Sequence, residues 1–420
     1  MRFILTPAGS QGDVHPYVGV GRRLKARGHE VVVLTAGPFR ELVQSAGLDF
    51  VETLSAEEFH ELTKDPDLWH PRRGLALIIG MTADNLVRGY ELLEDVYRPG
   101  DVLVGHLLSA AARLFQEKHD VPAATIQLAP SGIRSIDQVP PLTPGVDISS
   151  WPRPLKRLFW WLCDRFMIDP HLVPALNRLR AELGLQPAYR PFKGWLNSPR
   201  LVIAMFPDWF GGSPPDWPEQ VVEVGFPLYD EADLHDADDA LEAFLGAHQS
   251  SGGPIALTPG SANRHGKEFF AAGLAAADKL GRAALCLTGF PEQLPHPLPD
   301  FAFHARYAPF SRVFPRCCAV AHHGGIGTLG QGLAAGIPQL IMPLGFDQPD
   351  NAARLQRLGV GDWLVPARFQ AVAVAEKLER LIASVDVRQA CDRYRDALAG
   401  GDAIGKACDL LEEMGPPNAR

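Results

Sequence analysis

Residues 318–335 read CAVAHHGGIGTLGQGLAA and decide the fold. The first four residues form a short apolar run typical of a buried strand, and the last seven have the composition of a helix that ends at Gly336. Between the two lies the glycine-rich turn HHGGIGT. The stretch therefore predicts a strand, a turn and a helix in succession.

This turn has the properties of an anion site. Glycines ahead of a helix let backbone N–H groups approach an anion closely, and the helix N-terminus adds partial positive charge. The glycines do not follow the G-x-G-x-x-G fingerprint, and no P-loop lysine comes after them. We therefore expect a diphosphate held by His322 and by the backbone of Gly324, Gly325, Gly327 and Thr328.

An acid and an amide follow the next apolar run. Residues 339–343 (QLIMP) predict a second buried strand, and Asp347 and Gln348 come shortly after it. Open α/β sheets bind ligands at the carboxyl ends of their strands. Carboxylate and amide groups suit neighbouring hydroxyls. A site that binds both phosphate and hydroxyl groups suggests that the ligand is a nucleotide sugar.

Four blocks, HHGGIGT, AGIP, DQPDNA and RLGVG, follow one another over roughly forty residues. Their order and spacing resemble the donor-binding signature of the family 1 glycosyltransferases with the GT-B fold. The resemblance implies an α/β protein with two Rossmann-like, doubly wound parallel-sheet domains that face each other across a cleft. It also implies a hexosyltransferase that takes its sugar from a nucleotide donor.

The length of 420 residues suits two domains of about 200 residues each. We expect an acceptor-binding domain over residues 1–235, whose end overlaps a linker at about 229–253, and a donor-binding domain over 254–400. The resemblance further implies that a helix in 401–420 packs back on the first domain.

Composition narrows the possible partners and compartment. A net charge of −9 argues against a nucleic-acid surface. The six cysteines include no C-x-x-C pair, and the opening MRFIL is too short for the core of a signal peptide. No apolar run of about 18 residues could span a bilayer. We expect a cytoplasmic protein, with association with the inner face of the membrane left open.

Residues 2–16, RFILTPAGSQGDVHP, repeat the pattern of strand, turn and helix. Asp13 in this turn has two readings, a helix cap or a catalytic base. The resemblance favours the base, since G-D-V-H-P aligns with the G-H-x-x-P of plant relatives, where the histidine is the general base. A carboxylate of ordinary pKa near 3.9 would take the hydroxyl proton late in the reaction. His15 is the competing base, because neutral imidazole accepts protons near pH 7.

The resemblance also assigns further donor residues. Gly260 and Ser261 follow the predicted strand 254–259 and align beside the diphosphate. Tyr307 stands where plant relatives stack a tryptophan on uracil, and Gly330 stands in place of their ribose-binding glutamate. Both dTDP- and UDP-linked donors therefore stay open.

Residues 151–185 are aromatic and basic with a helical period. One reading is a pair of amphipathic helices packed on the sheet; the other is a wall for a lipophilic acceptor or a helix at a membrane interface. The candidates for the acceptor pocket are Trp69, His106, Ser131 and Trp160.

Several stretches, including DPDLWHPRRG, WLCDRFMIDP and GVGDWLV, resemble bacterial rhamnosyltransferases of rhamnolipid synthesis. This narrower resemblance implies a lipid-like acceptor such as a hydroxy-fatty acid and a rhamnosyl or glucosyl donor. We expect inverting transfer without a metal or other cofactor, and we interpret the D-x-D at 236–238 as part of an acidic linker.

Three rival functions remain. A glycosyltransferase for a sterol, polyketide or other natural-product alcohol is the nearest. A sugar-nucleotide 2-epimerase shares the fold, but its acid/base set is not evident in the sequence. A catalytically inactive nucleotide-sugar-binding protein is disfavoured because Asp13, His322, Asp347 and Gln348 are all present.

Overall fold

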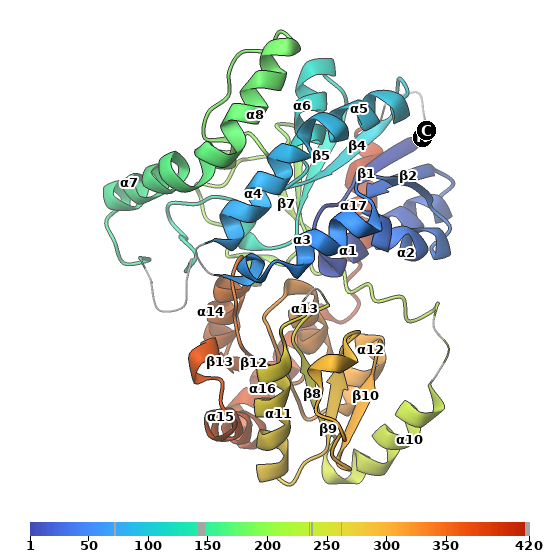
Figure 1. Ribbon diagram of the computed structural model, residues 1–420, viewed down its shortest axis with the longest axis vertical. Coiled ribbons are helices and arrows are strands. Elements are labelled where there is room, and N and C mark those ends of the chain that lie inside the picture. Colours follow the sequence, from blue (N-terminus) through green and yellow to red (C-terminus); the bar gives the residue numbers. More distant parts are fainter. Residues whose placement is uncertain (71–72, 142–147, 235, 237, 262, 416–420) are drawn as a thin grey trace. The chain divides into compact units, whose positions relative to one another are not determined.

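The computed structural model describes the chain except for residues 71–72, 142–147, 235, 237, 262 and 416–420. It divides into two compact units. Unit 1 comprises Met1–Pro140, Val146–Pro227 and Asp402–Arg420, and unit 2 comprises Pro141–Gly145 and Leu228–Gly401. Each unit is built on one parallel sheet flanked by helices (Figure 1). The predicted fold class is therefore confirmed.

The sheet of unit 1 has the strand order β3-β2-β1-β4-β5-β6-β7. Its strands are β1 (Arg2–Thr6), β2 (Glu30–Thr35), β3 (Asp49–Glu52), β4 (Val102–His106), β5 (Ala123–Gln127), β6 (Leu201–Ala204) and β7 (Val221–Glu223). The chain first builds β2 and β3 on one side of β1 and then crosses to β4 on the other side. The boundary between β1 and β4 is thus a topological switch point, where such sheets bind ligands.

The helices of unit 1 are α1 (Gln11–Ala26), α2 (Arg40–Ser45), α3 (Ala56–Lys64), α4 (Gly74–Asp84), α5 (Leu86–Val96), α6 (Ala110–His119), α7 (Arg153–Cys163), α8 (Asp169–Glu182), α9 (Asp208–Gly211) and α17 (Ala403–Glu413). Strand alternation gives the sheet two apolar faces. Ile4 packs in the cluster that includes Leu114 of α6, whereas Leu5 points toward Gly21 of α1. A Cβ at Gly21 would come within 3.2 Å of Leu5, so glycine permits the close approach of α1.

The C-terminal helix α17 belongs to unit 1 and packs on α1. Arg27, the C-cap residue of α1, pairs with Asp409 at 2.7 Å and with Glu412 at 2.8 Å. Glu412 also lies 2.7 Å from Nε2 of His29. Together with the buried apolar side chains of α17, including Ala407 and Leu411, these polar contacts hold the helix on the unit.

The sheet of unit 2 has the order β10-β9-β8-β11-β12-β13. Its strands are β8 (Ile255–Thr258), β9 (Ala284–Leu287), β10 (Ala302–Ala305), β11 (Ala319–His322), β12 (Gln339–Ile341) and β13 (Gly361–Trp363). The helices are α10 (Asp239–His248), α11 (Lys267–Lys279), α12 (Phe310–Val313), α13 (Ile326–Ala335), α14 (Gln348–Leu358), α15 (Ala371–Ala383) and α16 (Val385–Leu398). The switch point here lies between β8 and β11.

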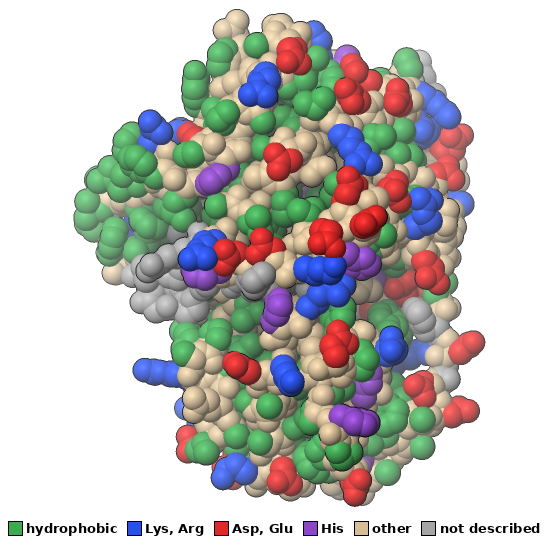
Figure 2. All heavy atoms as spheres, in the orientation of Figure 1, with side chains coloured by type: hydrophobic (Ala, Val, Ile, Leu, Met, Phe, Trp, Pro, Cys, Tyr) green, Lys and Arg blue, Asp and Glu red, His purple; other side chains and the backbone are tan. Residues whose placement is uncertain are grey.

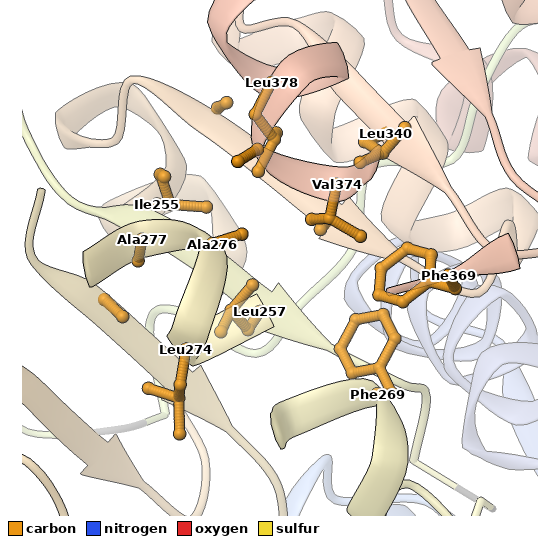
Figure 3. Close-up of a cluster of buried hydrophobic side chains, with 14 of the residues drawn as sticks. Ile255, Leu257, Phe269, Leu274, Ala276, Ala277, Leu340, Phe369, Val374 and Leu378 are labelled. Atoms are coloured by element: carbon orange, nitrogen blue, oxygen red, sulfur yellow. The ribbon is translucent and has the colours of Figure 1, made fainter. Parts of the chain in front are cut away.

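One face of this second sheet carries the apolar cluster shown in Figure 3. Ile255 and Leu257 of β8 point toward side chains of α11 and α15. Phe269 and Phe369 stack with ring centroids 5.1 Å apart and planes inclined by 14°. Ala256, between the two β8 residues, packs in a separate cluster on the opposite face. Because both faces are buried, the strands read as nearly continuous apolar runs.

Among the described residues, no helix is both long enough and apolar enough to cross a membrane.

Candidate functional site

Unit 1 places Asp13 at the switch point between β1 and β4. Ser10 is the N-cap of α1, and both its backbone N–H and its hydroxyl donate to Asp13 Oδ2, at 2.7 and 3.0 Å. Gly9 approaches so closely that a Cβ there would lie 2.3 Å from the same oxygen, and its φ of 130° also favours glycine. The turn therefore fixes one carboxylate oxygen of Asp13 by capping.

The other carboxylate oxygen, Asp13 Oδ1, lies 3.9 Å from Nε2 of His106 at the end of β4. His106 Nδ1 accepts the backbone N–H of Leu108 at 3.2 Å, which assigns the ring proton to Nε2, on the side of Asp13. Burial lowers the pKa of His106, and the charge of Asp13 opposes this shift. A neutral imidazole thus faces a carboxylate oxygen, an arrangement that can orient a hydroxyl group.

Tyr17 braces this pair from within the core. Its hydroxyl donates to Gly105 O at 3.0 Å, and its ring meets His106 edge-on with centroids 6.2 Å apart. Burial raises the pKa of Tyr17 well above its ordinary value. The phenol therefore stays protonated and serves as a fixed donor behind His106.

His15 points elsewhere. Residues two apart on a helix lie on different faces, so the side chains of His15 and Asp13 leave α1 in different directions. Its Nε2 lies 3.3 Å from the side-chain nitrogen of Gln11, one turn earlier. The structure therefore brings together Asp13 and His106 of the sequence candidates and leaves His15 on another side of α1.

The remaining acceptor candidates are spread over unit 1. Ser131 lies in the short helix η3 (Pro130–Gly132), which follows β5 at the same edge of the sheet. Trp160 is buried in α7. Its Nε1 donates to Ser135 O at 3.2 Å, and its ring stacks against the guanidinium of Arg134. These contacts pack Trp160 inside unit 1. Trp69 closes the helix η2 (Pro66–Trp69), and its side chain lies outside the described part of the chain.

Unit 2 places the glycine turn at the switch point between β8 and β11, as Gly260 follows β8 and His323 to Gly325 follow β11. Gly324 has a φ of 96°, and a Cβ there would lie 2.9 Å from Ile341. Gly325 is the N-cap of α13 and supplies no side-chain cap. The first amides of α13, at Ile326, exposed Gly327 and buried Thr328, are thus left to an external acceptor.

His322 has a different role from the predicted phosphate grip. It is fully buried, its Nε2 lies 2.9 Å from Gln339 Oε1, and its Nδ1 accepts the N–H of Gly324 at 3.1 Å. Burial, assisted by the neighbouring His323, lowers the pKa of His322 to about 3. With both ring nitrogens engaged, His322 shapes the turn from inside and has no donor to offer a ligand.

His323, which was not among the predicted site residues, lies beside the glycine turn. Its ring lies between two glycines: a Cβ at Gly260 would sit 2.7 Å from Cε1, and one at Gly325 would sit 2.6 Å from Nε2. Nε2 is thus beside the N-cap of α13. Nδ1 is buried without a hydrogen-bond partner among the described residues, and burial lowers the pKa of His323 to about 4.

Asp347 is the N-cap of α14 and Gln348 is its first residue, beside the same turn. Asn351 Nδ2 donates to Asp347 Oδ2 at 2.7 Å and to Gly324 O at 2.9 Å, so one amide ties the acid to the glycine turn. Gln348 Oε1 accepts the N–H groups of Leu344 at 2.8 Å and Gly345 at 3.2 Å. Gln348 thereby holds the loop before α14, and Asn351 is a site residue that the sequence did not single out.

The other donor candidates lie around this edge or farther along the unit. Ser261 is exposed directly after Gly260. Tyr307 is partly exposed, and its hydroxyl donates to Asp230 O at 2.6 Å. The D-x-D carboxylate Asp238 caps α10 by accepting from the N–H of Ala240 at 3.0 Å. No group of three or more His, Cys, Asp or Glu residues that could hold a metal occurs in the described ranges.

Two known protein families match parts of the chain, one near each end. Residues 3–90 match the glycosyltransferase family 28 N-terminal domain. Residues 291–405 match the C-terminal domain described as erythromycin biosynthesis protein CIII-like. O-mycaminosyltylonolide 6-deoxyallosyltransferase of Streptomyces fradiae is 29% identical over 98% of this chain and 97% of its own length.

Solved structures show the same fold over the whole length. The glycotransferase of kitacinnamycin superposes with a TM-score of 0.73 at 18% identity, covering 99% of each chain. The spinosyn rhamnosyltransferase SpnG, solved in complex with thymidine diphosphate, superposes with a TM-score of 0.69 at 20% identity. That match covers 98% of this chain and 100% of SpnG.

Proposed function

This chain belongs to the GT-B glycosyltransferases of family 1 and is a hexosyltransferase, and from this premise we propose the donor, the acceptor class and the residues of its reaction. The reaction is inverting, metal-independent transfer of rhamnose or glucose from a dTDP- or UDP-sugar to a hydroxyl group of a hydrophobic acceptor. The observation that carries the proposal is the uncapped N-terminus of α13 with His323 Nε2 beside it, at the switch point of unit 2.

The diphosphate of the donor binds at this turn. The amides of Ile326, Gly327 and Thr328 donate to its oxygens, and the partial charge of α13 favours the anion. His323 donates from Nε2 in place of His322, whose nitrogens are engaged. Asp347 and Gln348 face the sugar hydroxyls, with Asn351 as a positioning residue for Asp347. Thymidine diphosphate bound to the similarly folded SpnG supports a dTDP donor.

The acceptor hydroxyl binds at Asp13 and His106. Asp13 Oδ1 takes the proton while the hydroxyl oxygen attacks the anomeric carbon, and the bond from that carbon to the diphosphate breaks on the opposite face. The leaving diphosphate departs with the bonding electron pair. His323 and the amides of α13 stabilise the charge that develops there.

Two acceptor classes are consistent with this site. The resemblance to rhamnolipid-type enzymes favours a hydroxy-fatty acid. The relative from Streptomyces fradiae is by its name a glycosyltransferase of mycaminosyltylonolide, which favours a natural-product alcohol. Both are apolar molecules that carry a hydroxyl group, so they share the chemistry proposed for Asp13.

The test is an assay of the full chain with dTDP-rhamnose and UDP-glucose, each against a panel of hydroxy-fatty acids and macrolide or sterol alcohols. Mass spectrometry detects the added hexose, and the one-bond C1–H1 NMR coupling reports its anomeric configuration for both rhamnose and glucose. We expect product of inverted configuration that forms equally well in the presence of a chelator. A product of retained configuration, or loss of activity with the chelator, would overturn the mechanism.

A further inference from the structure

Helix α7 and the π-helical turn after it, η4 (Asp164–Ile168), present an apolar face to solvent. Hydrophobic side chains gather where α7 lies, at the left of Figures 1 and 2. Six large apolar side chains here are between 41 and 64% exposed: Leu155, Leu158, Trp161, Leu162, Phe166 and Met167. We call these six residues the α7 patch.

The patch is not the packing face of the helix. That face is formed by Trp160 and Cys163, with Ile168 of the π-helical turn, all of which are buried. Leu155, Leu158 and Leu162 are spaced three and four residues apart and therefore line one side of α7. A helix that is apolar on two sides is normally covered on both, and an exposed contiguous apolar surface marks an interaction site.

Arginines outnumber acids beside the patch, although Arg153 pairs with Asp137 at 2.9 Å. Arg153, Arg157 and Arg165 are exposed. Asp164, the acid between Trp151 and Ile168, is fully buried and bonds Arg134 and Arg190 at 2.7 Å each. This cationic surface therefore stands out on a chain whose net charge is −9. An apolar face with arginines beside it complements a bilayer with anionic headgroups.

We propose that the α7 patch docks the protein on the surface of an anionic lipid bilayer. Leucine, tryptophan and phenylalanine side chains enter the boundary between headgroups and acyl chains, and Arg157 and Arg165 meet the headgroup charges. This proposal rests on the exposed apolar side chains and the arginines beside them, and it does not depend on the proposed transferase reaction. If both hold, docking would give the enzyme access to acceptors that reside in the membrane.

The test is flotation of the full chain with vesicles of phosphatidylcholine, alone or mixed with phosphatidylglycerol. We expect binding to the mixed vesicles that weakens as salt rises. The double variant Leu158→Glu/Phe166→Glu should reduce the bound fraction at least about tenfold, because it removes two apolar anchors and adds negative charge. Arg157→Gln should reduce binding about fivefold.

Matched controls are Val372→Glu on α15 and Val385→Glu on α16, where the replaced valines are 55 and 61% exposed. Both should float like the wild type, and all variants should keep the wild-type melting temperature. The proposal is overturned if the wild type does not float or if the double variant floats like the controls. Sedimentation velocity provides a further test. A wild-type dimer that the double variant dissociates would show that a second copy covers the patch, and this result would also overturn the proposal.

Discussion

Asp13 Oδ1 and His106 Nε2 lie 3.9 Å apart across the switch point of unit 1, although 93 positions separate the two residues in the chain. Asp13 Oδ2, the other oxygen of the same carboxylate, is held by Ser10. The capping interaction and the proposed base therefore use different oxygens of one side chain. Removing the charge of Asp13 should accordingly affect both stability and catalysis, and the two effects can be measured apart.

The first prediction concerns Asp13→Asn, which keeps the size of the side chain but cannot take a proton. We expect kcat to fall by about 10²- to 10⁴-fold, the range for loss of a general base. The matched control is Ser10→Ala, which removes the hydroxyl bond to Asp13 and should cost about 1 kcal/mol of unfolding free energy with a much smaller loss of kcat. Steady-state kinetics and urea unfolding distinguish the two, and an Asp13→Asn enzyme with most of its kcat would refute the proposed base.

A second prediction separates the two candidate bases. Since His15 lies on another side of α1 from Asp13, His15→Ala should keep kcat within about threefold of the wild type. His106→Gln should lower kcat about tenfold or more, because the donor facing Asp13 Oδ1 is displaced. A larger loss in His15→Ala than in His106→Gln would reverse the assignment.

The third prediction concerns pH and stability. Burial lowers the pKa of His322 to about 3, whereas in the unfolded chain its pKa is near 6.5. Between these values the unfolded state binds more protons, so the contribution of His322 is complete above pH 6.5 and declines as the pH falls toward 3. The decline approaches about 1.4 kcal/mol per pH unit for this one group.

Urea unfolding of the wild type and His322→Gln between pH 7.5 and 4.5 measures this slope. This pH range includes the ordinary histidine pKa of about 6.5. The variant is expected to be less stable at pH 7.5 and to lose less stability on acidification. Parallel curves for the two proteins would contradict the buried, neutral state of His322.

The fourth prediction uses two glycines with positive φ. Gly260 has a φ of 98°, and a Cβ there would meet His323 at 2.7 Å, whereas Gly281 has a φ of 60° and nothing within 4 Å. Alanine should cost roughly 1 kcal/mol of unfolding free energy through backbone strain at either position. Gly260→Ala should in addition weaken nucleotide binding about tenfold or more, while Gly281→Ala leaves it unchanged. Equal nucleotide affinities would show that His323 and Gly260 are not part of the donor site.

Most strands could be predicted from short apolar runs, because both faces of each sheet are buried. β13 could not, since Gly-Asp-Trp carries no apolar run and pairs with β12 only through its backbone. The sequence predicts the glycine turn as a segment. Which histidine faces the proposed diphosphate site, His322 or His323, depends on where β11 ends. A difference of one residue at a strand end reverses the side to which a side chain points.

Segments far apart in the chain were harder to connect. His106 and Asp13 each stood out in the sequence, yet their pairing follows from the strand order β1-β4, which a local pattern does not contain. The aromatic segment around α7 was predicted to be helical, but its division into a buried face and an exposed patch depends on which side the protein core covers. Asn351 could not be singled out from the sequence, because its role is to join Asp347, at the start of its own helix α14, to Gly324 in the glycine turn.

The most direct test of the proposed donor site is calorimetric titration of dTDP and UDP into the wild type, His323→Ala and the control His248→Ala, which alters a partly exposed histidine of α10. Loss of one hydrogen bond to a charged diphosphate corresponds to about 10- to 100-fold in affinity. We predict that dTDP binds the wild type and His248→Ala alike and binds His323→Ala at least about tenfold more weakly. If neither nucleotide binds, or if His323→Ala binds as tightly as the wild type, the proposed donor site is wrong.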